Sequence, residues 1–496
     1  MFEKITPEQA GISSKRVLKF INSLEKHGII MHSILLMKGD KLFTEGYYAP
    51  FHADFNHRMY SQTKSYVGVA IGLLEEDGLI NLDDKVCDYF RDKITRELPP
   101  WLENQTVRQM LTMTTSAVGC NWFTSEDPDR TSIYFNRKSV IRPAGTYWTY
   151  DSPGSQVLCA LVERVSGKCL FDFLRERIFS HLGTFKNATI LKTKNEDSWG
   201  DSALLCTPRD MASFARFVMN YGTWQGKRLM NEQYLRTATS PLRDNRSDYN
   251  GFDLSVTHGY GDQIWCTEEE GFAFCGMGGQ DTVCIPKKDL IVVYTGDNQG
   301  NGSARAVTLC SLFDNIVDEM GDEPLPEDEE AYAALEEKLA SLKLAVTRGE
   351  KSADYQEKVN GKRFVCEKND MGIKHFILHF AGETGELRYE NAQGEKVLTF
   401  GLGANAFGKF PEDGYSDGHG GLPGPDGFHY DCATSGAWSE ARKFNLFCRV
   451  IDRYFGNLYI TFAWAKDGTA HVQMLPTAEN FFGAYRGSMI AYPEKE

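Results

Sequence analysis

Apolar residues near the N-terminus recur with the periods of two helices and one β-hairpin. Between residues 13 and 27 they fall three and four positions apart, as in an amphipathic helix, and the serines before them are good helix caps. Two short apolar runs, 33–37 and 42–46, flank a polar turn and predict a hairpin. Residues 65–74 are mostly apolar and are followed by an acidic turn and Gly78, which predicts a buried helix with a glycine stop.

The following 200 or so residues are dominated by helical patterns and then return to strands. Residues 80–250 are mostly helices and long loops, with an apolar helix at 155–162, whereas residues 251–296 have strand patterns. Because strands stand at both ends and helices between them, we predict one antiparallel sheet built from both ends of the domain and flanked by helices. The predicted fold class is α+β.

The composition changes after residue 320. Residues 321–330 are acidic and contain two prolines, residues 331–344 have the pattern of a polar helix, and short strands separated by glycine-rich turns follow. These patterns predict a C-terminal all-β domain, either a barrel or a sandwich. The expected divisions are a first domain at 1–320, an acidic linker and helix at 321–345, and the all-β domain at 346–496.

Composition narrows the classes of function. The chain has 496 residues, of which 42% are hydrophobic, as is ordinary for a globular protein. A formal net charge of -14 argues against nucleic acid or an anionic membrane as a partner. The N-terminus lacks the basic and apolar regions of a signal peptide, and the twelve cysteines show no disulfide or metal-ligand spacing. We therefore expect reduced thiols, a cytoplasmic location and no cofactor.

Two further features have alternative interpretations. The glycine-rich stretch 414–427 lacks the signatures of a calcium or phosphate loop, so it is interpreted as a flexible connector or as a lid over a catalytic pocket. His375 and His379 fall on one face of a predicted strand, with no third ligand evident in the sequence. We interpret them as surface or core histidines and predict no metal site.

The first candidate chemistry is at Ser61 and Lys64, just before the predicted helix 65–74. Residues three apart lie on the same face of a helix, so the Lys64 amine can reach the Ser61 hydroxyl. Desolvation favours a neutral amine, so a lysine in a dry pocket can act as the base that a serine nucleophile requires. The N–H groups of the first turn would also favour an oxyanion there. Alone, this spacing is weak evidence, because it occurs by chance in many chains and a capped helix with a solvated lysine explains it.

Two later segments complete a recognisable set of motifs. Tyr150-Asp151-Ser152 leads into the predicted helix 155–162, and the strand 272–276 is followed by a second pair of strands. In this order, the segments resemble those of the serine β-lactamase and penicillin-recognising superfamily, whose signature is Ser-x-x-Lys, then Tyr-x-Asn or Ser-x-Asn, then Lys-Thr-Gly or a variant. The resemblance is strongest to the class C β-lactamase and esterase branch and covers about residues 5–315.

This resemblance implies a role for each matching residue. Ser61 would be the nucleophile, Lys64 and Tyr150 would transfer protons, and the backbone N–H groups of Ser61 and Met277 would hold the oxyanion. Six residues are expected to bind substrate. They are Ser152 of the central motif, Phe274, Cys275 and Gly276 of the strand motif, and Trp122 and Arg142 from other segments. Trp122 lies in a predicted loop, where it either lines a substrate pocket or is ordinary packing.

Two departures from the signature change the expected substrate. Ser152 stands where asparagine is commoner, and Phe274 stands where relatives carry lysine or histidine. That cation typically meets a substrate carboxylate, so an apolar wall at Phe274 weakens the case for β-lactams and carboxylate-ended peptides. Arg142 is the nearby cation that would replace it. Gly276, which closes the motif, is kept, and we expect it to let substrate lie along the strand edge.

The sequence therefore predicts a serine hydrolase that cleaves an ester or amide of a small molecule through an acyl-enzyme on Ser61. Transfer of the acyl group to an alcohol is a second outcome of the same intermediate. The first alternative is a β-lactamase or D-amino-acid peptidase. The second is a binding protein that keeps the fold without turnover, and the third assigns the function to the C-terminal domain. The oligomeric state is left open by the sequence.

Overall fold

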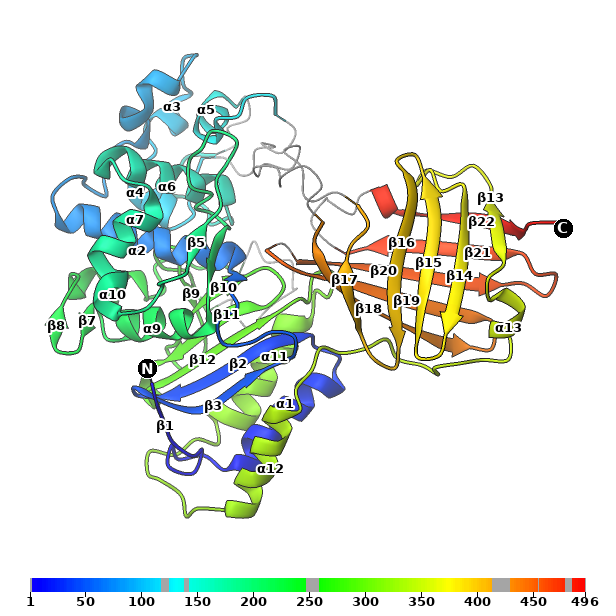
Figure 1. Cartoon of the computed structure of the whole chain (residues 1–496). Helices are drawn as coiled ribbons and strands as arrows, with labels where there is room; N and C mark the ends of the chain where they lie inside the picture. The colour runs from blue at the N-terminus through cyan, green and yellow to red at the C-terminus, as the bar shows by residue number, and fades with distance from the viewer. Residues whose placement is uncertain are drawn as a thin grey trace. The chain divides into compact units, whose positions relative to one another are not determined.

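The computed structural model describes residues 2–116, 125–137, 142–246, 258–412, 429–453, 455–477 and 484–495. The chain divides into two compact units, and the boundary lies between Lys343 and Leu344 (Figure 1). The helix expected beside the acidic linker is α12 (Glu329–Ala340), and it packs against α1 (Ser14–Lys26) within the first unit. Within the described part of the chain, no helix is long and apolar enough to cross a membrane.

A seven-stranded sheet forms the centre of the first unit, in the order β1-β3-β2-β12-β11-β10-β9. Neighbouring strands are antiparallel except for β1 and β3, and the N-terminal hairpin pairs directly with β12 from the other end of the unit. This confirms the prediction of one sheet assembled from both ends of the domain. The strands are β1 (Glu3–Lys4), β2 (Met31–Lys38), β3 (Lys41–Tyr47), β9 (Trp265–Cys266), β10 (Phe272–Gly276), β11 (Gln280–Ile285) and β12 (Leu290–Gly296).

Helices cover both faces of this sheet (Figure 1). Helices α1, α11 and α12 pack on one face, and α2, α6 and α9 lie on the other. Shorter helices surround the second group. Besides α1 and α12, the helices on the two faces are α2 (Thr63–Glu76), α3 (Pro100–Glu103), α4 (Val107–Leu111), α5 (Arg130–Asn136), α6 (Ser152–Ser166), α7 (Leu170–Leu174), α8 (Ser180–Leu182), α9 (Pro208–Met219), α10 (Glu232–Ala238) and α11 (Ala304–Leu312).

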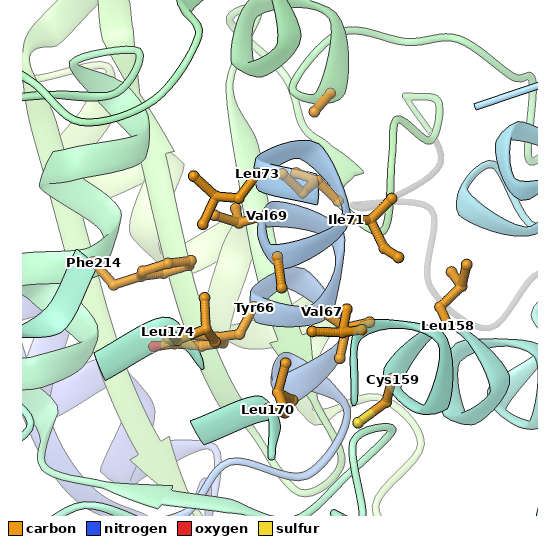
Figure 2. Packing of buried hydrophobic residues seen from close by; sticks show 14 of the residues in the cluster. Tyr66, Val67, Val69, Ile71, Leu73, Leu158, Cys159, Leu170, Leu174 and Phe214 are labelled. Carbon is orange, nitrogen blue, oxygen red and sulfur yellow. The ribbon is translucent and has the colours of Figure 1, made fainter. Parts of the chain in front are cut away.

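Helix α2 is buried on every side, which explains its apolar sequence. Its side chains radiate between Leu158 and Cys159 of α6 on one side and Phe214 of α9 on the other (Figure 2). A Cβ on Gly72 would lie 2.3 Å from the Tyr234 ring, so the helix needs a glycine there to pack against α10. The predicted stop is also present, because Gly78 has a φ of +68°.

Small strands outside the main sheet support the turn before α2. β4 (His57–Arg58), β6 (Leu204–Cys206) and β5 (Thr189–Ile190) form a three-stranded sheet in that order. β7 (Thr223–Trp224) and β8 (Lys227–Arg228) pair separately. The sequence patterns did not predict these strands, since strands of two or three residues are too short to show a period.

The second unit is a closed β-barrel of nine strands, which decides between the barrel and the sandwich that were predicted. Its strands follow the order β16-β15-β14-β13-β22-β21-β20-β19-β18, and β16 closes the ring by pairing with β18, while β17 pairs with β18 beside that closure. The elements are α13 (Gln356–Val359), β13 (Arg363–Cys366), β14 (His375–Ala381), β15 (Thr384–Asn391), β16 (Gly394–Leu402), β17 (Ala406–Lys409), β18 (Asp431–Glu440), β19 (Lys443–Ile451), β20 (Phe455–Trp464), β21 (Ala470–Pro476) and β22 (Gly487–Pro493). The stretch 414–427 lies outside the described residues.

Candidate active site

Ser61 lies in the turn between β4 and α2, in a single 3-10 turn at Tyr60–Gln62. The Met59 N–H donates to the Leu204 carbonyl at 2.8 Å, which attaches this turn to β6. Tyr60 has a φ of +47°, a left-handed conformation that non-glycine residues seldom adopt. Such strain persists only where the surrounding contacts impose it, and it is concentrated at functional sites.

Lys64 is buried next to Ser61. Its Nζ donates one hydrogen bond to Ser61 Oγ at 2.9 Å and another to the Asp201 carbonyl at 2.7 Å, and the residue is only 1% exposed. The predicted proximity of amine and hydroxyl is therefore present in the structure. The interpretation as a capped helix with a solvated lysine does not fit, because this lysine has almost no contact with solvent.

Asp201 balances positive charge beside the nucleophile. Its Oδ2 is 3.9 Å from Lys64 Nζ, and its Oδ1 is 3.7 Å from Arg130 Nη1. All three side chains are buried, and the Arg130 guanidinium also lies over the Trp199 ring, 4.4 Å from its centroid. The Asp201 carboxylate thus lies between the Lys64 amine and the Arg130 guanidinium, which offsets the cost of burying polar and charged groups here. Sequence reasoning missed both Asp201 and Arg130, and neither belongs to a motif that could have identified it.

Tyr150 turns the face of its ring toward Lys64. The Lys64 Nζ is 5.1 Å from the ring centroid, a cation–π arrangement, and the ring also stacks on Trp265, with centroids 5.5 Å apart. Asp151, which follows it, is buried and accepts a hydrogen bond from Thr115 Oγ1 at 2.8 Å. Burial raises the pKa of the Asp151 carboxyl group above its ordinary value. The structure thus brings Tyr150 beside the Ser61–Lys64 pair, with a buried carboxyl group holding the segment that follows.

The end of β10 lies against the turn that carries Ser61. Gln62 Nε2 donates to the Phe274 carbonyl at 3.0 Å, and a Cβ on Gly276 would lie only 2.2 Å from the Met59 carbonyl oxygen. A glycine is therefore required for this close approach of strand and turn. The Met277 side chain, directly after it, is 41% exposed, so the peptide that would provide the second oxyanion donor lies at the surface end of the strand.

An ion pair between the partly exposed Arg305 and the buried Asp281 fixes the same end of β10. Arg305 of α11 donates from Nε and Nη2 to the two carboxylate oxygens of Asp281, at 3.0 and 3.1 Å, and from Nη2 to the Gly276 carbonyl at 2.8 Å. Asp281 also accepts from the Gly276 N–H at 3.2 Å and from Tyr294 Oη at 2.8 Å. Burial opposes the charge on Arg305, but the Asp281 carboxylate holds the pKa of the guanidinium well above its ordinary value. This network was also missed by sequence reasoning.

Phe274 is placed differently from the expectation. Its side chain is fully buried and packs on Phe214 of α9 and on Phe272, with ring centroids 5.6 and 5.8 Å apart. Alternate residues of a strand point to opposite faces, and Cys275 accordingly lies in the apolar layer on the other face of the sheet. The expectation that the Phe274 ring forms a wall of the substrate site is therefore corrected: the ring belongs to the core beneath β10.

The remaining predicted substrate residues have mixed positions. Ser152 is the half-buried first residue of α6. Arg142 Nε donates to the Thr115 carbonyl at 3.1 Å, and its guanidinium lies 5.2 Å from the centroid of the Tyr147 ring, so both of these contacts are structural. Trp122 lies outside the described residues.

Two clusters in the described part of the chain have the proximity expected of metal ligands. They are Cys87, Asp88 and Glu103, and His375, Glu390 and Glu395. Arg91 forms ion pairs with both carboxylates of the first cluster, and Arg363 Nη2 lies 3.1 Å from His375 Nδ1 in the second. Arg91 thus explains the acidic residues of the first cluster as ion pairs. In the second cluster, Glu390 forms an ion pair with Lys374. The described cysteines are free thiols, and burial raises the pKa of Cys87 to about 11.

Comparisons with known proteins identify relatives of the first unit. The family model described as Beta-lactamase matches residues 19–308. A 6-aminohexanoate-dimer hydrolase from Paenarthrobacter ureafaciens is 24% identical over 282 residues, which cover 53% of this chain and 71% of that protein. Among solved structures, a candidate 6-aminohexanoate-dimer hydrolase from Bacillus anthracis aligns with a TM-score of 0.53 and 17% identity, over 66% of this chain and 89% of that one. The structural likeness shows a shared fold.

Proposed function

Because this chain belongs to the β-lactamase family, we propose that it is a serine hydrolase that cleaves an ester or amide of a small molecule through an acyl-enzyme on Ser61. The observation that carries this proposal is the 2.9 Å hydrogen bond between the buried Lys64 Nζ and Ser61 Oγ. The position of Tyr150 against Lys64 and the approach of β10 to the same turn support it.

In the proposed cycle, Ser61 Oγ forms a bond to the substrate carbonyl carbon while its proton passes to the pair formed by Lys64 and Tyr150. The carbonyl electron pair moves onto oxygen, where the N–H groups of Ser61 and Met277 stabilise it. When the tetrahedral intermediate collapses, the bond to the leaving group breaks and Tyr150 returns a proton to that group. Water then attacks the acyl-enzyme, its proton passes to the same pair, and Ser61 is released with its hydroxyl restored.

The substrate class is proposed from two observations. The relative named as a 6-aminohexanoate-dimer hydrolase supports testing that dimer as well as esters. Residue 274 is a phenylalanine whose ring lies in the core, so this position supplies no cation to bind a substrate carboxylate. This supports a preference for substrates that have no carboxylate near β10. A nucleophilic alcohol could replace water in the second half of the cycle, so acyl transfer remains part of the proposal.

Labelling with a fluorophosphonate probe tests the nucleophile. We expect the wild-type protein to become covalently labelled on Ser61, and Ser61→Ala to lose both labelling and hydrolysis of p-nitrophenyl acetate. Ser65→Ala is the matched control, because Ser65 lies four positions after Ser61, in the first turn of α2, but its Oγ donates to the Gln263 carbonyl. If the wild-type protein were not labelled, a non-catalytic binding protein would be the better description; if Ser61→Ala kept its activity, the nucleophile would be misassigned.

A substrate panel then separates the proposed hydrolase from its nearest alternative. Short p-nitrophenyl esters, the 6-aminohexanoate dimer and a chromogenic cephalosporin should be compared by kcat/KM with the same purified protein. Faster turnover of the cephalosporin than of every ester and of the linear amide would favour a β-lactamase. We also propose a cytoplasmic location, which the free thiols of the described cysteines support.

A further inference from the structure

A pocket of about 470 Å³ lies between α2, α4 and α10, and it shares no residue with the candidate active site. Gly72 and Glu75 of α2 contribute to its wall, and Gly72 follows Ser61 by eleven positions. At 1.5 Å of rise per residue, Gly72 lies about 13 Å along α2 from Thr63, the first residue of the helix after the Ser61 turn. The volume is in the range of small-molecule sites.

Asp262 contributes an unpaired carboxyl group to this pocket. The residue is only 3% exposed, and its buried Oδ1 accepts no hydrogen bond from another described residue. Its backbone is held firmly, because the Asp262 N–H donates to the Ala238 carbonyl at 3.1 Å and the Gln263 side chain next to it donates to two carbonyls of α4. A buried carboxyl group without a partner is costly, and such a group in a folded protein requires an explanation.

The charges around the pocket favour a cation. Glu75 and Glu76 lie on the last turn of α2, where the helix dipole also attracts positive charge. Arg108 lines the same pocket, but its Nε and Nη2 donate to the two carboxylate oxygens of Asp83, at 2.9 and 3.2 Å, so its charge is already matched. The Gln233 amide adds further hydrogen-bonding capacity at the rim, whereas Asn231 Oδ1 already accepts from the N–H groups of Gln233 and Tyr234.

These acceptors are not arranged for a metal ion. In the described part of the chain, the clusters whose ligand atoms lie close enough together for one ion include neither Asp262 nor Glu75. An organic cation does not need such convergence, because its N–H groups can reach several separated acceptors. We propose that this pocket binds a small molecule through a primary ammonium or guanidinium group that donates to the Asp262 carboxylate.

Burial and its neighbours make this binding dependent on pH. Burial raises the pKa of Asp262 to about 7; Glu75 acts in the same direction, whereas Arg108 and Arg243 lower it. A cation should therefore bind well at pH 8.5, where the carboxylate form prevails, and more weakly at pH 5.5.

The test uses n-butylammonium as the probe and n-butanol as its neutral counterpart, titrated into the full-length protein by NMR or calorimetry at pH 8.5. We expect saturable binding of the ammonium in preference to the alcohol. Asp262→Asn keeps the shape of the side chain and removes its charge, so affinity should fall about 10- to 100-fold, as for the loss of a charge-assisted hydrogen bond. Glu232→Gln is the matched control, because this exposed carboxylate of α10 pairs with Arg228 and Arg236 and should leave affinity unchanged.

Three results would overturn the proposal: no saturable binding, equal affinity of wild type and Asp262→Asn, or equal affinity for the ammonium and the alcohol. The wild-type affinity at pH 5.5 against pH 8.5 provides a second measurement that needs no variant. Because the readout is binding in a pocket apart from Ser61, the result is independent of whether the protein hydrolyses esters.

Discussion

Arg305 is expected to orient the peptide that supplies the Met277 N–H to the oxyanion. Its Nη2 donates to the Gly276 carbonyl at 2.8 Å, and the carbonyl of residue 276 and the N–H of residue 277 belong to one planar trans peptide. The two groups therefore point in opposite directions, and a guanidinium that fixes the carbonyl also fixes the N–H. Arg305→Lys keeps the positive charge but cannot contact Asp281 and Gly276 with the same fork geometry.

The magnitude of the effect follows from what this peptide is proposed to do. Loss of one oxyanion donor costs about 10²–10³-fold in kcat, and a tilted donor should lose part of that. We expect Arg305→Lys to lower kcat about 10- to 100-fold and to change KM by less than about threefold, because the contact matters mainly in the transition state.

Stability must be measured separately, since the ion pair is also structural. The Asp281 side chain is fully buried, so Arg305→Met would leave a buried carboxylate without its cation and lower the free energy of unfolding by about 3–5 kcal/mol. Adding Asp281→Asn to that variant removes the unpaired charge and should recover part of the stability without recovering kcat.

The assay combines steady-state hydrolysis of a p-nitrophenyl ester with urea unfolding for wild type, Arg305→Lys, Arg305→Met and the double variant. The reasoning is refuted if Arg305→Lys retains kcat within about twofold of wild type, or if the double variant regains activity in step with its stability. In either case Arg305 would hold the fold together without orienting the Met277 peptide.

Three further predictions concern the core, a buried carboxyl group and the catalytic pair. Phe274→Lys should lower the free energy of unfolding by more than about 3 kcal/mol, whereas Phe274→Leu costs under about 1.5 kcal/mol; a stable lysine variant that turned to carboxylated substrates would place this side chain in the site instead. Asp262 has a pKa of about 7 in the folded protein against 3.8 ordinarily, so the folded state binds its proton more tightly than the unfolded state does. The resulting contribution to the free energy of unfolding is greatest below pH 3.8 and is lost as the pH rises through 7. Without ligand, Asp262→Asn should therefore raise the free energy of unfolding by up to roughly 4 kcal/mol at pH 8.5 and hardly change it at pH 4, and equal effects at both pH values would contradict the assignment. Lys64→Ala and Tyr150→Phe should each slow acylation by several orders of magnitude, with a combined loss well below additive in a double-mutant cycle, and full additivity would indicate separate steps.

Local patterns predicted several elements of both units. The periodic stretch 13–27 contains α1 (Ser14–Lys26), and the apolar run 65–74 lies within α2 (Thr63–Glu76). The apolar residues of α1 recur three and four positions apart, and α2 is apolar along most of its length, so both helices can be recognised without knowledge of the elements they pack against. The barrel was harder to predict, because alternation shows that a strand is half-buried but leaves open whether the sheet closes on itself. Closure depends on the pairing of β16 with β18, which no single strand reveals.

The contrast between local patterns and contacts of distant elements also separates the site residues that could be predicted from those that could not. Ser61 and Lys64 meet because helical geometry fixes residues three apart, whereas Asp201 reaches Lys64 from a loop far along the chain. Motif comparison gave the position of Phe274 but not the face of β10 on which its ring lies. That face depends on strand register, and a shift of one residue exchanges the two faces.

The sequence correctly indicated that residue 276 must be small, but the structure gives a different reason for it. We expected a small residue so that substrate could lie along the strand edge, but a Cβ there would first meet the Met59 carbonyl, 2.2 Å away. Glycine is therefore needed to assemble the site before any substrate arrives, because it lets β10 approach the turn that carries Ser61. The same approach lets Gln62 donate to the Phe274 carbonyl, and it brings the peptide held by Arg305 to this end of the strand. A contact of this kind depends on the placement of two distant elements at once, which is why the residue type is visible in the sequence and its purpose is not.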